Sequence, residues 1–115
     1  MFALETEKRD QVLIVRLSGE LDHHTAPELR TALDRALDGD GVRDIVLNLS
    51  ALSFMDSSGI GVLLGRYKKV QSLGGRLVVC GLGPTVRRIF ELAGLLKILT
   101  VAASEAEALD ALGVA

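Results

Sequence analysis

The residues with the clearest chemical potential are three in a row, Asp56, Ser57 and Ser58, followed by Gly59. They lie between an apolar run and a segment with helical periodicity, so Asp56 is predicted to be the N-cap of a helix. Ser57 and Ser58 would then occupy the first two helical positions, where unpaired backbone N–H groups and the helix dipole favour an anion. This placement indicates a phosphate site, with the phosphate either bound or covalently attached.

A serine at this position could act as a phosphorylation switch. A phosphoserine carries about −1.5 to −2 charges, which the start of a helix accommodates. The same charge in a protein interface is repelled or left desolvated, so modification would block binding without unfolding the chain. The residues alone leave a second interpretation open, in which Ser57 and Ser58 are ordinary capping serines.

Two enzymatic alternatives use the same turn. A hydrolase nucleophile elbow needs glycine two residues before and after the serine, but Met55 takes the earlier position for Ser57. Gly59, Gly61 and Gly65 have the spacing G-x-G-x-x-x-G, one residue too long for a dinucleotide loop. We therefore predict no catalytic residue. Gly61 and Gly65 are instead expected to let the helix approach the sheet or a partner closely.

A second polar cluster consists of Asp22, His23, His24 and Thr25. Adjacent histidines in a loop rarely converge on one metal ion without a third ligand, so we predict no metal site and no cofactor. A structural or partner-contacting role is the better interpretation. Thr25, with Glu28 three residues later, is predicted to form a capping box.

Strand and helix signals alternate along the chain. The predicted strands cover residues 4–9, 12–19, 45–49, 76–80 and 96–101. The predicted helices begin after Thr25, Asp56, Gly83 and Ser104. Ser104, with Glu107 three residues later, is predicted to form a second capping box. This order predicts an α/β fold with a mixed, mainly parallel sheet of about five strands, four helices and an N-terminal hairpin.

Length and charge narrow the class of protein. The 115 residues are expected to form a single domain, residues 1–115, and the net charge of −2 gives no reason to expect nucleic acid or a membrane as partner. Arg66, Lys68 and Lys69 are interpreted as a solvated helix face. Early charges argue against a signal peptide, so a cytoplasmic location is expected. The single cysteine, Cys80, excludes an internal disulfide and is predicted to be a buried, small hydrophobic residue.

Several stretches resemble the anti-sigma factor antagonists of sporulating bacteria, the stage II sporulation protein AA family. They are residues 19–26, 55–59, 61–62, 64–68, 78–80, 86–90, 94–95 and 112–115. The Asp-Ser-Ser-Gly turn marks the wider antagonist family, and the Asp-His-His-Thr loop with the carboxy-terminal ending is similar to the sporulation members. The resemblance runs essentially from end to end and implies the STAS fold.

The resemblance also implies a function without catalysis. In this family the unphosphorylated protein binds an anti-sigma factor that is a serine kinase, stage II sporulation protein AB, and so releases a sporulation sigma factor. The kinase phosphorylates the second serine of the turn with ATP, and a phosphatase, stage II sporulation protein E, removes the phosphate. An antagonist in a stress-response sigma pathway is the alternative, and the free protein is expected to be monomeric.

Carried over to this chain, the resemblance makes Ser58 the phosphorylated residue, and Ser57 matches the first serine of the turn. Asp56 would cap the helix, while Gly59 and Gly61 would keep the approach to Ser58 open for the kinase.

The Asp22–Thr25 loop follows a neighbouring strand at the edge where sheets of this type carry their sites. Asp22, His23, His24 and Thr25 are therefore expected to complete the surface that faces the partner.

Overall fold

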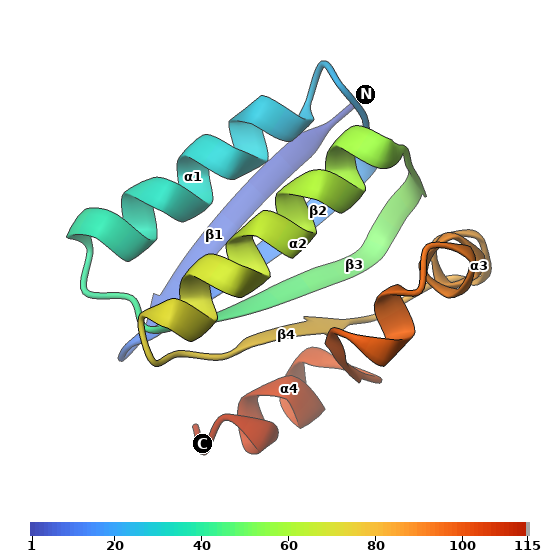
Figure 1. Cartoon of the computed structure of the whole chain (residues 1–115). Helices are drawn as coiled ribbons and strands as arrows, with labels where there is room; N and C mark the ends of the chain where they lie inside the picture. Colours follow the sequence, from blue (N-terminus) through green and yellow to red (C-terminus); the bar gives the residue numbers. More distant parts are fainter. Residues whose placement is uncertain (115) are drawn as a thin grey trace.

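A five-stranded mixed sheet forms the centre of the protein in the computed structural model, which describes residues 1–114 (Figure 1). The strands are β1 (Ala3–Arg9), β2 (Val12–Leu21), β3 (Asp44–Met55), β4 (Leu77–Cys80) and β5 (Thr100–Ala102), in spatial order β1-β2-β3-β4-β5. The helices are α1 (Ala26–Gly39), α2 (Ser57–Ser72), α3 (Pro84–Leu92) and α4 (Glu105–Ala111), with a 3-10 turn at Leu95–Lys97. The predicted fold class is confirmed.

The N-terminal hairpin is also confirmed. β1 runs antiparallel to β2, with Arg9 opposite Val12 and Ala3 opposite Ser18, and the chain reverses at Asp10, whose φ is 52°. The remaining neighbours pair in parallel. Parallel neighbours need a crossover between them, and the helices α1, α2 and α3 lie in those crossovers.

Side-chain alternation along the strands gives the sheet two faces. One face carries Leu13, Val15 and Leu17, which belong to the same buried cluster as Leu33 of α1 and Leu63 of α2. Figure 1 shows α1 and α2 side by side across this face. The opposite face is covered in part by α4 and has its own, smaller cluster; its members include Val12, Ile14, Val46 and Leu109.

Two strands are longer than predicted. β2 was expected to end at Gly19 but continues to Leu21, because Gly19 adopts a positive φ of 88° within a register shift instead of ending the strand. β3 was expected to end at Leu49 but continues to Met55 along β2. As a result Leu21 and Met55 are paired, and both strands end at the same point of the sheet edge.

The last strand is shorter than predicted. Residues 96–101 were expected to be extended, but Leu95–Lys97 form a 3-10 turn and the strand is confined to Thr100–Ala102. Gly94, with a φ of 75°, redirects the chain. Leu95 and Leu99 are the buried apolar residues here, and their spacing of four fits a helical turn and not the alternation of a strand.

An ionic contact fixes α4 to the sheet. Arg16 of β2 donates two hydrogen bonds to Glu105, at 2.7 and 3.0 Å, and Asn48 of β3 donates a third at 2.7 Å. The Arg16 guanidinium holds the pKa of Glu105 below its ordinary value, so the carboxylate stays charged at neutral pH. The predicted capping of this helix by Ser104 is confirmed, since its hydroxyl accepts from the Glu107 N–H at 3.2 Å. The Glu107 carboxylate accepts from the Ala103 N–H at 3.0 Å, one residue before the position that the predicted capping box requires.

The start of α2 packs tightly on the ends of β2 and β3 through one glycine. A Cβ on Gly59 would lie 2.7 Å from Met55 Cγ and 2.9 Å from Leu21 Cδ2. Around Gly61 and Gly65 a Cβ would meet nothing within 4 Å. Gly61 and Gly65 therefore do not bring the helix close to the sheet, and Gly59 has that role. The other half of the expectation, a close approach of a partner at Gly61 and Gly65, stays a prediction.

Substitutions at Gly59 and Gly61 should have opposite effects on stability. Gly59→Ala should lower the free energy of unfolding by about 1–3 kcal/mol, because the new methyl group overpacks the Leu21–Met55 junction. Gly61→Ala should raise the same free energy by about 0.5–1 kcal/mol, since alanine favours an open helical position. Urea unfolding of both variants measures the difference. Equal effects at the two positions would contradict the packing role of Gly59.

Candidate functional site

Two connections meet where β2 and β3 end. The switch turn, residues 55–59, runs from the last residue of β3 into the first turn of α2, and the Asp22 loop, residues 22–25, follows β2. The Asp56 N–H donates to the Leu21 carbonyl oxygen at 3.1 Å, which continues the pairing of the two strands beyond Met55. The expectation that the loop and the turn share one edge of the sheet is confirmed.

Asp56 caps α2 as predicted. Its backbone is extended, with φ −102° and ψ −171°, and its Oδ1 accepts from the Ser58 N–H at 2.8 Å and from the Gly59 N–H at 3.3 Å. Ser57 and Ser58 are the first two helical residues. The cap leaves Asp56 Oδ2 facing the Asp22 loop, 3.9 Å from Nδ1 of His23.

The two serines have different surroundings. Ser57 is exposed, whereas Ser58 is half-buried and lines an open pocket of about 330 Å³ between α1 and α2. We call this the Ser58 pocket; its lining residues are Arg30, Ser58, Gly61, Val62 and Arg66. Ser58 can therefore be reached from solvent, as a residue that accepts a phosphoryl group must be.

The Asp22 loop is held by Asp22 and not by the capping box predicted at Thr25. Thr25 has helical backbone angles, so its hydroxyl turns back, accepting from the Asp22 N–H at 2.9 Å and donating to the Glu20 carbonyl at 2.9 Å. Asp22 Oδ1 accepts from the backbone N–H groups of His24 and Thr25. Partial burial raises the pKa of Asp22, but these N–H groups outweigh it and hold the pKa below its ordinary value.

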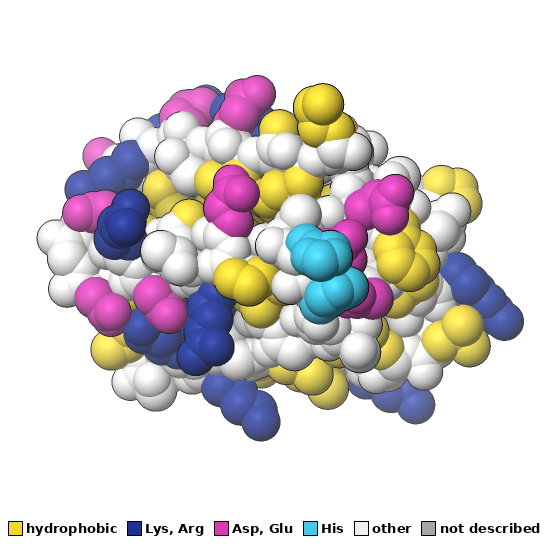
Figure 2. All heavy atoms as spheres, turned by 90° about the horizontal axis from the view of Figure 1, so that it is seen from above, with side chains coloured by type: hydrophobic (Ala, Val, Ile, Leu, Met, Phe, Trp, Pro, Cys, Tyr) yellow, Lys and Arg dark blue, Asp and Glu magenta, His cyan; other side chains and the backbone are white. Residues whose placement is uncertain are grey.

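His23 and His24 project from the Asp22 loop. Both are exposed, and their ring centroids lie 3.9 Å apart with the planes tilted by 39°. Figure 2 shows the two rings together on one face, beside acidic and hydrophobic side chains. Within residues 1–114 no group of three or more His, Cys, Asp or Glu side chains is arranged to hold a metal ion. No helix in the same range is long and apolar enough to cross a membrane.

Cys80 lies away from this chemistry. It is fully buried at the end of β4, as predicted, and burial raises the pKa of its thiol to about 11. The thiol is therefore protonated at neutral pH and is a poor nucleophile.

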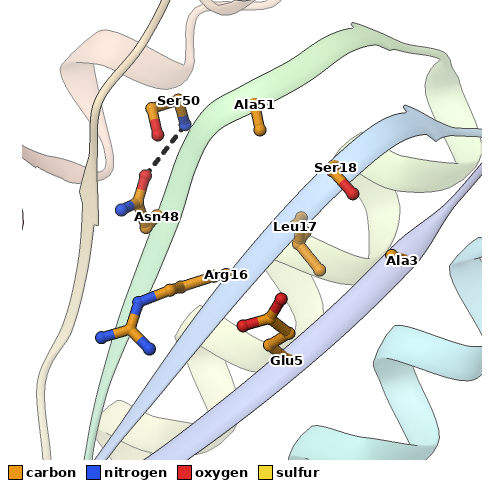
Figure 3. A pocket seen from close by; sticks show the side chains of 8 residues that line it. All are labelled: Ala3, Glu5, Arg16, Leu17, Ser18, Asn48, Ser50 and Ala51. Atoms are coloured by element: carbon orange, nitrogen blue, oxygen red, sulfur yellow. Dashed lines mark hydrogen bonds between the residues drawn. The ribbon is translucent and has the colours of Figure 1, made fainter.

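Another pocket, of about 230 Å³, lies on β1, β2 and β3, with α1 and α2 behind the sheet (Figure 3). Its lining includes Arg16, Asn48 and Ser50. Arg16 is already paired with Glu7 and Glu105. The Ser58 pocket is different, because the arginines on its wall lie beside a serine at a helix N-terminus.

Sequence reasoning missed Arg30 and Arg66 as neighbours of Ser58. Arg66 was interpreted as part of a solvated face, but its side chain is only 14% exposed. It lies two turns beyond Ser58 on the same side of α2, a spacing that could have indicated its position. Arg30 gives no such signal, because the packing of α1 against α2 alone brings it to the pocket.

The sequence profile of the STAS domain matches residues 3–108. The chain belongs to the STAS domain family of anti-sigma factor antagonists. It is 48% identical over 111 residues to the anti-sigma F factor antagonist of Paenibacillus polymyxa, covering 96% of this chain and 95% of that one. It is 37% identical over 98 residues to the anti-sigma-B factor antagonist of Staphylococcus aureus, covering 85% and 90% of the two chains. The phosphorylated form of the Bacillus cell fate determinant SpoIIAA superposes with a TM-score of 0.76 at 36% identity, over 96% of this chain and 99% of that one.

Removing the cap of this STAS domain should weaken the switch turn. Asp56→Ala should lower the free energy of unfolding by about 0.5–2 kcal/mol, because two N–H groups lose their acceptor. Asp56→Asn, which keeps an acceptor oxygen, should lose less, and Ser57→Ala serves as the control next to it. Thermal and urea unfolding measure these effects. Equal stability of Asp56→Ala and the parent would show that the carboxylate does not act as a cap.

Proposed function

We propose that this chain is an anti-anti-sigma factor controlled by phosphorylation of Ser58. The unphosphorylated form binds an anti-sigma factor that is also a serine kinase, similar to stage II sporulation protein AB, and thereby frees a sporulation sigma factor. The observation that carries the proposal is the position of Ser58, at the second residue of a capped helix on the wall of an open pocket. The 48% identity to an anti-sigma F factor antagonist supports it.

The covalent step needs only a hydroxyl from this chain. Oγ of Ser58 attacks the γ-phosphorus of ATP, the new O–P bond forms, and the bond from that phosphorus to the β,γ-bridging oxygen breaks. ADP leaves, and the hydroxyl proton passes to a base of the kinase. The chain is thus the substrate of its partner and not an enzyme.

Because of the position of Ser58, its phosphorylation is expected to affect binding and not folding. The first turn of α2 has backbone N–H groups and a partial positive charge, so a dianion there is compatible with the helix. In the complex, the phosphoryl group would place a charge of about −2 in an interface that accommodates a neutral hydroxyl in the unmodified form. Phosphorylation therefore disfavours the complex while the fold is retained.

The Asp22 loop is proposed to supply the rest of the partner-facing surface. His23 and His24 are exposed, and Asp22 and Thr25 hold the loop in shape through their hydrogen bonds. The contact between His23 and Asp56 brings the loop next to the switch turn. A partner that reaches Ser58 would therefore meet this loop as well.

Gly59 and Gly61 are proposed to support the switch in different ways. Gly59 is buried and seats the first turn of α2 on the sheet. Gly61 is exposed and lines the Ser58 pocket without a side chain, which leaves the approach open.

The cycle is completed by a serine phosphatase similar to stage II sporulation protein E, which restores the hydroxyl of Ser58 by hydrolysis. We propose that this cycle takes place in the cytoplasm and that the free protein is a single-domain monomer. The second candidate is an antagonist in a stress-response sigma pathway; the 37% identity to an anti-sigma-B factor antagonist supports it. The higher identity to the anti-sigma F relative favours the sporulation pathway.

The kinase should modify one residue. Incubation with the cognate anti-sigma factor and ATP, followed by peptide mass spectrometry, should place a single phosphate on Ser58. Ser58→Ala should remain unmodified while still binding the kinase, and Ser57→Ala should be modified like the parent. A phosphate on Ser57, Thr25 or Ser53 in the parent would contradict the assignment.

A permanent negative charge at Ser58 should imitate the modified state in binding. Ser58→Asp should weaken the complex with the anti-sigma factor at least about tenfold, equivalent to about 1.4 kcal/mol, in isothermal titration calorimetry. Its free energy of unfolding should stay within about 0.5 kcal/mol of the parent, because the helix start accepts the charge. If Ser58→Asp instead unfolds far more easily than the parent, the switch acts through folding and the proposed mechanism is wrong.

A further inference from the structure

The Ser58 pocket is basic. Two of its five lining residues are the arginines Arg30 of α1 and Arg66 of α2, and no acidic residue lines it. Arg66 lies eight residues after Ser58, about 12 Å along the helix axis. Long side chains in a helix lean toward its N-terminus, which here is the direction of Ser58. The same pocket is therefore lined by a serine and by two arginines.

The two guanidinium groups already converge on one anionic oxygen. Oδ2 of Asp34 lies 3.2 Å from Nη1 of Arg66 and 4.0 Å from Nε of Arg30. This geometry shows that arginines from two different helices can share a single oxyanion at this place. Arginine's fork of donors suits phosphate oxygens as well as carboxylates.

Arg66 has a donor to spare. Its Nε is buried and, among the described residues, finds no hydrogen-bond acceptor. A buried N–H without a partner is costly, so an acceptor that reached it would be bound favourably. Arg66 is held in place by Asp34 and is mostly buried, so little further ordering is needed for it to bind an anion.

Local charge also favours an added anion. Three cations, Arg30, Arg66 and Lys69, surround the carboxylates of Asp34 and Asp38. One positive charge in this cluster is not compensated by a carboxylate of the cluster. Of the two serines, Ser58 lines this pocket together with the arginines and Ser57 does not.

We propose that the phosphoryl group on Ser58 folds back into the Ser58 pocket and is bound there by Arg66 and Arg30. This inference rests on the proposed phosphorylation of Ser58 and adds a receiving site within the chain itself. The phosphoryl group shares the arginines with Asp34 and accepts from the free Nε of Arg66. The modified state is then stabilised from within, and the phosphatase must withdraw the group from the pocket before hydrolysis.

The test installs phosphoserine at position 58 by genetic encoding, so that it does not depend on any kinase. The second pKa of the phosphate, about 6 for free phosphoserine, is measured by phosphorus NMR titration. Arg66→Gln and Arg30→Gln should each raise this pKa by roughly half a unit relative to the otherwise unchanged phosphoprotein. Arg35→Gln, on the same helix as Arg30 and exposed, should leave it unchanged.

A difference in phosphate pKa between these variants reports the contribution of the substituted arginine alone. The other charged and titratable groups near the phosphate are the same in every variant. They are the Asp56 carboxylate, which accepts from the Ser58 N–H, the neighbouring His23, and Asp34 and Lys69 beside the pocket. Arg30 has a side chain 65% exposed, so Arg30→Gln should fold even if Arg66→Gln is destabilised by the loss of its bond to Asp34.

The outcomes separate this inference from the proposed function. If Arg30→Gln and a folded Arg66→Gln titrate like Arg35→Gln, the phosphoryl group points to solvent and the receiving pocket is refuted, while kinase mapping to Ser58 can still hold. If the kinase modifies another residue, the proposed function fails, although the encoded phosphoserine would still report on the pocket. A raised pKa in both arginine variants supports the inference.

Discussion

The parallel pairing of β2 and β3 up to their last residues is the constraint on which the candidate site depends. Leu21 and Met55 are paired, and the Leu21 carbonyl then accepts from the Asp56 N–H. This hydrogen bond fixes the backbone from which the Asp56 side chain can cap α2. Gly59 lets the first turn of the helix rest directly on the same two residues. A chain that ended either strand earlier would leave the serines on a loop without a fixed direction.

In a site built in this way, a modification can change partner binding without changing the stability of the fold, although the two usually vary together. Residues whose modification changes binding often also contribute to the core, where a new charge is destructive. Ser58 lies at a helix start on the rim of the fold, with the core beneath it formed by apolar side chains and by Gly59. The surface can therefore change its charge while the packing below it does not change.

The charged residues between α1 and α2 contribute more than solubility. Asp34 of α1 binds Arg66 and Lys69 of α2, and Asp38 also binds Lys69. The hydrogen bonds to Asp38 and Asp34 raise the pKa of Lys69, so the lysine stays charged throughout the physiological range. These contacts hold in register the two helices that form the walls of the Ser58 pocket. Exposed ion pairs are individually weak, but a partly buried network orients its members.

Local patterns in the sequence determined the fold class, the N-terminal hairpin, the capping of α2 by Asp56 and the capping of α4 by Ser104. These features depend on residues near one another in the chain, and the conformational preferences of such residues do not depend on distant contacts. Only the tertiary structure decided how far β2 and β3 extend, because their last residues are extended only where the two strands pair with each other. It also decided that Thr25 bonds backwards to Asp22 and Glu20, and that Gly59, not Gly61, contacts the sheet. The position of Arg30 beside Ser58 arises from the packing of two helices, and no spacing along the sequence encodes a contact of that kind.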